Sequence, residues 1–238
     1  MRAILTDNVR PFRVVISSAS KIFPELFFLF ERNEVSITGI TPNHLTVMSC
    51  LLERDFFERY ECGNEKTQAS LDSATLEKVL SRVGSKLLIR TRDESFILET
   101  LDTPLRTFAV PIKKIWEVPP ETYFREYSHK CSVEIPPPVF RQVISDCAVV
   151  SEEIHVLCKQ NGIAFKAEGE MGEYTYGRAD DPEEDAFVSV VMLRDVRGIA
   201  KLASISRLVR ISTGKELPLL IEFLLAHAHV SFLVSSRS

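Results

Sequence analysis

Arginine and lysine side chains recur at helical spacing in four segments of this chain, together with small hydroxyl side chains. In the first segment, the spacing of three or four residues places Arg10, Arg13, Ser17 and Lys21 on one side of a helix. Cations and hydroxyls can neutralise and hydrogen-bond phosphate oxygens without reading bases, so such faces suit a nucleic-acid backbone. The alternative for each segment is an ordinary solvated helix face. The cations assigned to these faces are Arg10, Arg13, Lys21, Lys78, Arg82, Arg141, Arg194, Arg197 and Lys201.

Catalytic and metal chemistry have weaker support in the sequence. His227 and His229 lie on one face of an expected strand, and this spacing permits a metal site, but no acidic or cysteine ligand lies close by in sequence. Residues 212–216 match part of a phosphate-binding loop but lack its upstream glycine and the hydroxyl after lysine, which favours a hairpin turn. No nucleophile motif of the Gly-x-Ser-x-Gly type is present. We therefore predict no enzyme activity, no cofactor and no metal.

Composition and cysteine content limit the class of protein. The chain has 238 residues and a net charge of −4, so any basic surface must be local, with acids gathered elsewhere, as in residues 180–185. Its five cysteines form no CxxC pair, which predicts a reducing, intracellular environment and no disulfide framework. We expect no membrane segment and no signal peptide. The expected location is inside the cell.

The sequence repeats itself at a fixed spacing. Residues 12–17 return as residues 140–145, and eight of the 28 pairs that start at residues 12 and 140 are identical. A repeat of about half the chain predicts two similar domains in tandem. We place the first domain at residues 1–112, a linker at residues 113–130 and the second domain at residues 131–238. Pro119 and Pro120 lie in this linker.

Each half is expected to follow the plan β-α-β-β-β…α-β-β-β, an α+β fold dominated by antiparallel sheet. The opening strands are residues 3–6 and 131–135, followed by helices for which Asp7 is the expected N-cap in one half and Pro137 and Pro138 form the first turn in the other. Hairpins join residues 26–31 to 35–40 and 154–158 to 163–167. The last strands are residues 219–224 and 230–234. The inner faces of the four helices are Phe12, Val15, Ile16 and Ala19; Phe140, Val143, Ile144 and Cys147; Leu76, Val79, Leu80 and Val83; and Ile199, Leu202 and Ala203.

Three segments, on this duplicated frame, resemble the DNA sliding clamps of the proliferating cell nuclear antigen type, found in archaea and eukaryotes. They are residues 35–47 (VSITGITPNHLTV), 165–172 (FKAEGEMG) and 217–223 (LPLLIEF), and the resemblance extends over the whole chain. It implies a ring of three subunits, with helices lining the hole and antiparallel sheets outside. The cationic helix faces would then surround double-stranded DNA without reading its sequence, and the ring would tether polymerase and other replication or repair enzymes.

The resemblance also implies a pocket for a short hydrophobic-aromatic peptide carried by DNA polymerase, flap endonuclease, DNA ligase and the clamp loader. An ordinary core position is the alternative for each apolar residue, whereas His44, in a turn, is expected to be exposed. Residues 233–238 depart from the family's usual Ala-Pro-Lys or Ala-Pro-Arg ending, so partner choice is expected to differ. The positions carried over to this pocket are Ile40, His44, Leu45, Val47, Val118, Pro119, Pro218, Phe232, Leu233 and Val234.

Subunit contacts are implied at two strand edges, where pairing would cover an otherwise open edge. The residues are Leu105, Phe108 and Val110 on one edge and Tyr174, Tyr176 and Arg178 on the other. The neighbouring subunit is either an identical chain or a diverged sibling in a mixed trimer. Two alternatives to a replication clamp remain, a clamp-shaped scaffold in DNA-damage signalling and, more remotely, an enzyme with a His227/His229 metal site.

Overall fold

The computed structural model describes residues 1–63, 66–113, 124, 127–159, 162–177 and 187–236. Its contacts divide the chain into two compact units. The first comprises Met1–Pro42, Met48–Pro120 and Ala226–His229, and the second comprises Asn43–Val47, Glu121–Leu225 and Val230–Ser238. Most of the expected linker lies outside the described residues, so its limits at 113 and 130 stay a prediction.

The first unit holds two helices, a 3-10 turn and most of nine strands. In chain order these are β1 (Arg2–Leu5), α1 (Val9–Ala19), β2 (Glu25–Phe30), β3 (Glu34–Ile40), β4 (Thr46–Glu53, from Met48 on), η1 (Arg54–Phe56), β5 (Arg59–Glu61), β6 (Thr67–Asp72), α2 (Ser73–Leu80), β7 (Leu87–Arg92), β8 (Ser95–Thr100) and β9 (Arg106–Pro111). The strands are arranged in the orders β5-β1-β7-β8-β9 and β4-β3-β2-β6.

The second unit repeats this plan. Its elements are β10 (Cys131–Ile135), α3 (Pro137–Val150), β11 (Glu153–Lys159), β12 (Gly162–Gly169), β13 (Gly172–Tyr176), β14 (Phe187–Met192), α4 (Leu193–Ile199), η3 (Ala200–Ser204), β15 (Leu208–Thr213), β16 (Leu219–Leu224) and β17 (Ala228–Val234, from Val230 on). The strand orders are β10-β15-β16-β17 and β13-β12-β11-β14. These match β1-β7-β8-β9 and β4-β3-β2-β6 strand for strand, which confirms an α+β fold of two repeats with antiparallel pairing.

The repeat keeps one register over the first elements and then shifts. Elements α1, β2 and β3 start at residues 9, 25 and 34, and α3, β11 and β12 follow at 137, 153 and 162 with a constant offset. Elements β6 and α2 start at residues 67 and 73, whereas β14 and α4 start at 187 and 193, a shorter offset. The first unit therefore uses more residues between its hairpin and its second helix, and these include η1 and β5. Strand β5 pairs with β1, and among the described residues of the second unit no strand takes that place beside β10.

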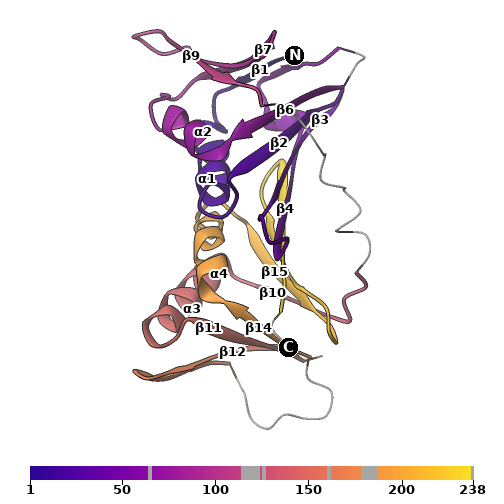
Figure 1. Cartoon of the computed structure of the whole chain (residues 1–238), viewed down its shortest axis with the longest axis vertical. Helices are drawn as coiled ribbons and strands as arrows, with labels where there is room; N and C mark the ends of the chain where they lie inside the picture. Colours follow the sequence, from indigo (N-terminus) through magenta and orange to yellow (C-terminus); the bar gives the residue numbers. More distant parts are fainter. Residues whose placement is uncertain (64–65, 114–123, 125–126, 160–161, 178–186, 237–238) are drawn as a thin grey trace. The chain divides into compact units, whose positions relative to one another are not determined.

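Apolar stripes place the helices on the sheets as expected. Phe12, Val15, Ile16 and Ala19 of α1 and their counterparts in α3 are all buried. Figure 1 shows α1 and α2 side by side in the first unit and α3 and α4 side by side in the second, in agreement with their packing contacts. Val79 is only half-buried, which corrects its assignment to the inner face of α2, where Leu76 and Leu80 are the buried apolar residues.

Helix termini agree with the sequence in one half and differ in the other. Pro137 and Pro138 start α3 as expected, since proline needs no hydrogen-bond acceptor there. Asp7 was the wrong cap for α1, because Asn8 occupies the N-cap position. The Asn8 side chain does not cap the helix either, and its Nδ2 donates instead to the carbonyl of Phe56 at 2.7 Å. Asn8 thereby joins the start of α1 to η1.

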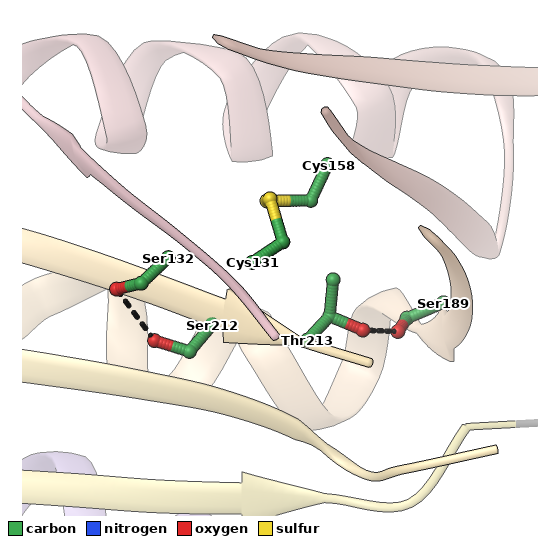
Figure 2. Close-up of a disulfide and its surroundings, with 6 residues drawn as sticks. All are labelled: Cys131, Ser132, Cys158, Ser189, Ser212 and Thr213. Atoms are coloured by element: carbon green, nitrogen blue, oxygen red, sulfur yellow. Dashed lines mark hydrogen bonds between the residues drawn. A yellow bond between two sulfur atoms is a disulfide. The ribbon is translucent and has the colours of Figure 1, made fainter. Parts of the chain in front are cut away.

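The cysteines are the clearest correction to the sequence analysis. Cys131 at the start of β10 and Cys158 on β11 form a disulfide, so the expectation of unpaired thiols alone was wrong (Figure 2). Cys50, Cys62 and Cys147 are not part of a disulfide. The bond connects the two sheets of the second unit, because β10 belongs to one sheet and β11 to the other. Elsewhere in the part of the chain described, no helix is long and apolar enough to cross a membrane.

Candidate nucleic-acid and partner surfaces

The cationic face of the first unit lies on the packed helices α1 and α2 and on the turns that follow them. Arg10, Lys21, Lys78 and Arg82 are exposed to solvent. Arg13 is half-buried, and its Nη1 lies 3.5 Å from the carbonyl oxygen of Val83 beyond the end of α2. Four of the five predicted cations of this unit are therefore accessible to a phosphate, and Arg13 also helps to join the two helices.

An acid on this face was missed by the sequence analysis. Glu77 of α2 accepts hydrogen bonds from the hydroxyls of Ser17 and Ser20, both at 2.7 Å, and lies 3.8 Å from the ammonium group of Lys21. Ser17, which was expected to offer its hydroxyl to phosphate, is thus engaged within the protein. Glu77 directly precedes Lys78 in the sequence, and this was the available signal that an acid lies near the cationic face. Glu77 lowers the positive charge of the first-unit face and holds α1 against α2.

The cationic face of the second unit is more concentrated. Arg141 of α3, Arg197 of α4 and Lys201 of η3 line one shallow hollow of about 190 Å³ with Ser145. All three cations are exposed. Arg194 is also exposed but lies 3.7 Å from Asp195, which partly offsets its charge. Asp146 does not compete for these cations in the described contacts, since it accepts from Gln142 at 2.7 Å.

The two faces differ at one repeat-related position. Glu77 and Arg197 are each the fifth residue of their helix, α2 and α4, which are counterparts in the two units. Ser17 and Ser145 likewise occupy the same position in α1 and α3. The same pair of sites is therefore a closed hydroxyl–carboxylate contact in the first unit and an open hydroxyl–guanidinium group in the second. We expect the second unit to make the stronger phosphate contacts.

Several residues assigned to the partner pocket belong to the core instead. Val47, Phe232, Leu233 and Val234 are at most 5 % exposed, so their side chains do not line an open surface. The continuous apolar run at the end of β17 is typical of a strand covered on both faces, which explains the error. Val118 and Pro119 lie outside the described residues. Ile40 is half-buried at the end of β3 in the first unit.

The loop before β4 presents two of the expected pocket residues. His44 is exposed and adopts a left-handed backbone with φ of 57°, and Leu45 has 48 % of its surface exposed. The side chain of Asn43 supports this turn by accepting from the amide of Leu45 at 3.2 Å. The carbonyl of Leu45 accepts from the amide of Ser235 at 2.8 Å, which ties the loop to the C-terminal segment.

A hollow of about 340 Å³ in the second unit, here called the tail hollow, includes one pocket residue that the sequence predicted, Pro218. It lies between the turn after β15 and the segment after β17, and apolar and polar side chains share its wall. Three further lining residues had only weak signals in the sequence. The aromatic content of the linker was the signal for Tyr127, and the departure of residues 233–238 from the family pattern was the signal for Ser235 and Ser236. The lining residues are Tyr127, Val188, Glu216, Leu217, Pro218, Ser235 and Ser236.

Two hydrogen bonds fix the wall of the tail hollow. The Ser236 hydroxyl accepts from the amide of Val190 at 3.0 Å, so the segment after β17 is attached to the edge of β14. The Nε2 atom of His129 lies 2.9 Å from the carbonyl oxygen of Pro218 and donates to it in the matching tautomer. Glu216 is exposed, with a left-handed backbone at φ of 57°. The hollow therefore offers apolar surface, hydroxyls and one carboxylate.

Both strands assigned to subunit contacts end a strand order in their own unit, β9 in the first and β13 in the second. Leu105 is 70 % exposed and Phe108 is half-buried, but Val110 is only 2 % exposed and belongs to the core, a correction to its assignment. On β13, Tyr176 is 38 % exposed. Burial and the nearby carboxylate of Asp146 raise the pKa of Tyr174 to about 12. Arg178 lies outside the described residues.

The histidine pair makes no metal centre in the described part of the chain. There, no group of three or more histidine, cysteine, aspartate or glutamate side chains is placed to hold an ion. His227 is exposed, and its Nδ1 lies 3.8 Å from Glu53.

Known proteins match this chain along its length. Residues 124–237 match the family model described as proliferating cell nuclear antigen, C-terminal domain. The DNA polymerase sliding clamp 1 of Thermococcus kodakarensis is 26% identical over 245 residues, covering 98% of this chain and 97% of the relative. The DNA polymerase sliding clamp of Pyrococcus horikoshii is 26% identical over 249 residues, with the same coverage.

A solved structure shares the whole fold. The PCNA2–PCNA3 complex from Sulfolobus tokodaii aligns with a TM-score of 0.88 at 19% identity, covering 100% of this chain and 99% of that one. This likeness shows the two-domain clamp fold, and the sequence matches extend over nearly the full length. The duplicated frame, the family model over the second half and the full-length relatives agree in their similarity to the proliferating cell nuclear antigen family.

Proposed function

We propose that this chain is one subunit of a ring-shaped DNA sliding clamp that encircles duplex DNA and tethers polymerase and other replication or repair enzymes. The observation that carries the proposal is the pair of cationic helix faces, one in each repeat, on a fold shared with sliding clamps. Such a role needs no catalytic residue. It requires a surface that binds phosphates weakly and without sequence preference, so that a closed ring can slide.

The composition of the helix faces supports this role. Their exposed cations lie on helices or, for Lys21 and Arg82, in the turn directly after one, and the three that line the second-unit hollow are supplied by α3, α4 and η3. Phosphate contacts of this kind depend strongly on salt and not on base identity. A ring held by topology would tolerate that weakness.

Ring closure is supported by the two open strand edges. Head-to-tail pairing of β9 of one subunit with β13 of the next uses two different surfaces, and such heterologous contacts close into a ring when the rotation permits. Exposed Leu105 on one side and exposed Tyr176 on the other would be covered by the pairing. An open edge left unpaired invites aggregation.

Partner enzymes are proposed to bind the tail hollow and the adjacent Leu45 loop. A short segment with apolar and aromatic side chains fits the exposed side chains of Leu45 and Val188 and the half-buried Pro218. Glu216 adds a carboxylate, so we propose that preferred segments of polymerase, flap endonuclease, ligase or loader also carry a lysine or arginine. A basic residue beside the apolar plug would gain a salt-dependent contact.

Charge reversal tests the DNA role. Arg10, Lys78 and Lys201 are exposed, so changing all three to glutamate should leave folding and the number of subunits in the assembly unchanged. It should reduce polymerase stimulation on primed circular DNA by at least about tenfold, because like charges replace the phosphate contacts. A matched control reverses Arg54, Arg59 and Arg92, which are exposed on η1, β5 and β7. Equal loss in both variants, or full stimulation by the helix variant, would contradict the assignment of the cationic helix faces to DNA.

Mass measurement and pull-down test the partners. A stable trimer of the purified chain at micromolar concentration indicates identical subunits, whereas a monomer that forms rings only with related chains indicates a mixed ring. Capture of polymerase, flap endonuclease and ligase supports a replication role. Failure to capture any of them, with DNA encirclement retained, supports the damage-signalling scaffold instead.

A further inference from the structure

The Cys131–Cys158 disulfide lies at a corner where the two sheets of the second unit meet. Cys131 is the first residue of β10 and is 6 % exposed, and Cys158 on β11 is fully buried. Strand β10 pairs on one side with β15, and it ends the strand order of its sheet. Among the described residues, no strand pairs with the other side of β10. The disulfide therefore attaches an edge strand covalently to β11.

The same corner leads directly into the tail hollow. Cys131 pairs in register with Thr213, the last residue of β15. The turn that follows Thr213 supplies Glu216, Leu217 and Pro218 to the hollow. His129 lies two residues before Cys131, and its Nε2 is 2.9 Å from the carbonyl oxygen of Pro218. Tyr127, four residues before Cys131, and the turn after the paired residue Thr213 therefore both form part of the wall.

Strand β14 joins the hollow to the corner from the opposite side. The hydroxyl of Ser189 lies 2.5 Å from that of Thr213, and both residues are buried (Figure 2). Val188, which precedes Ser189 on β14, lines the hollow. Val190, which follows Ser189, donates its amide to the hydroxyl of Ser236, another lining residue. Figure 2 also shows the hydrogen bond between Ser132 and Ser212, next to the Cys131–Thr213 pair. Three strands and the C-terminal segment thus share one small junction.

The repeat shows that the shared frame does not require this bond. In the register that relates α1 to α3, the first-unit counterparts of Cys131 and Cys158 are Ala3 and Phe30, both buried and neither able to form a disulfide. In the first unit β5 covers the edge of β1 instead. The covalent attachment is therefore particular to the unit that contains the tail hollow.

We propose that the Cys131–Cys158 disulfide makes partner binding at the tail hollow dependent on redox state, with the oxidised form binding more tightly. This inference rests on the proposed function, because it concerns regulation of the same partner site. With the bond intact, β10 is held to β11, and Tyr127, His129 and the Pro218 turn keep one arrangement. With the bond reduced, the edge strand keeps its pairing with β15 and its packing but loses its covalent link to β11, and the arrangement able to bind becomes less populated.

The chemistry of the switch needs a dithiol reductant. A thiolate of the reductant attacks the sulfur of Cys131, the more exposed of the two, the disulfide breaks, and the sulfur of Cys158 leaves as a thiolate and takes up a proton. The second thiol of the reductant then attacks the mixed disulfide and releases Cys131, also protonated. Two electrons and two protons pass to the protein, and the reductant becomes a disulfide.

Two measurements on the full chain define the states. Under denaturing conditions, the oxidised protein should show three titratable thiols, from Cys50, Cys62 and Cys147, and the reduced protein five. Hydrogen exchange of the amides in residues 127–133 and 214–218 should be faster after reduction, while the amides of β1 and β7 in the first unit stay unchanged. Five thiols in protein purified without reductant and then treated with oxidised glutathione would overturn the proposal.

Binding is then measured with a defined probe, a short fluorescein-labelled peptide with one aliphatic and two aromatic side chains and one lysine. If reduction lowers the binding-competent fraction to about a tenth, the apparent Kd rises about tenfold. The variant C131A/C158A should bind like the reduced protein and should not respond to reductant. The variant C62A, which removes a thiol outside the disulfide, should respond like the original chain. If C131A/C158A does not fold, oxidised and reduced original chain are compared alone.

The outcomes separate this inference from the proposed function. A Kd that is equal in both redox states overturns the redox inference and leaves the partner site intact. Absence of probe binding in the oxidised protein overturns the partner site and, with it, the inference. Retention on circular DNA, measured independently, decides the clamp role in either case.

Discussion

Replacing Glu77 with glutamine should weaken the protein and strengthen its attraction to DNA at the same time. Its carboxylate accepts two hydrogen bonds at 2.7 Å, from Ser17 and Ser20, which join α2 to α1. A hydrogen bond to a charged group is worth about 1 kcal/mol more than a neutral one. Because the Glu77 side chain is 30% exposed, water reduces that difference. We expect E77Q to lower the free energy of unfolding by about 1–1.5 kcal/mol, or about 3–5 °C in Tm.

The effect on DNA has the opposite sign. Removing one negative charge at about 8 Å from a phosphate, in water, is worth about 0.5 kcal/mol, or about twofold in affinity for each subunit. The matched variant is R197Q, at the repeat-related position in the second unit. Arg197 is exposed on the hollow that also contains Arg141. R197Q should leave stability nearly unchanged and reduce the slope of log affinity against log salt by about 0.9 for each subunit.

Urea denaturation and anisotropy of a labelled duplex, titrated with salt, measure the two effects. An exposed acid away from the helices, Glu58, provides the control E58Q. The reasoning is refuted if E77Q is as stable as the original chain, because the two serine contacts would then contribute nothing. It is also refuted if E77Q and E58Q raise DNA affinity equally, since position on the helix face would then be irrelevant.

Three further predictions concern single side chains. Asp72 caps α2 by accepting from the amide of Thr75 at 2.8 Å, and hydrogen bonds to Thr75 hold its pKa below the usual 3.8. D72A should cost about 1 kcal/mol at neutral pH. Because the pKa of Asp72 is lowered in the folded state, the stabilisation by its carboxylate is complete above pH 3.8 and disappears as pH falls through the folded pKa. The stabilities of D72A and the original chain, measured by acid denaturation, should therefore converge at low pH. The buried hydroxyl of Ser18 has no hydrogen-bond partner among the described atoms, so S18A should be neutral or stabilising by up to about 1 kcal/mol in urea, and a clear loss would contradict this. E216Q should weaken a lysine-bearing probe peptide about threefold at low salt and leave its lysine-free analogue unchanged, which fluorescence anisotropy can measure.

The repeat in the sequence was a strong guide to the fold. The Phe12 and Phe140 stripes and the hairpins that follow them were predictable because local periodicity reports burial on one face. The start of β10 at Cys131 was predicted as well. The extra residues that form η1 and β5 in the first unit were not anticipated, since their short segments show no clear period.

The candidate surfaces were less predictable, for a physical reason. Exposure of Arg197 follows from its own helix, but the pairing of Glu77 with Ser17 depends on how two helices pack. Phe232 and Val234 were mistaken for pocket residues because a family position says nothing about which face of this strand is covered. The Cys131–Cys158 bond joins different sheets, and a separation of 27 residues gives no indication of that.

The two repeats fasten their opening strands by different means. Strand β1 is held by hydrogen bonds to β5, whereas β10 is held by sulfur. A cross-link over 27 residues is worth about 3.5 kcal/mol in chain entropy. The first repeat would thus keep its resistance to unfolding under oxidising and reducing conditions alike. The second repeat would lose part of its resistance once the disulfide is reduced. Calorimetry in thiol buffer should then separate the halves into two transitions that oxidation brings together.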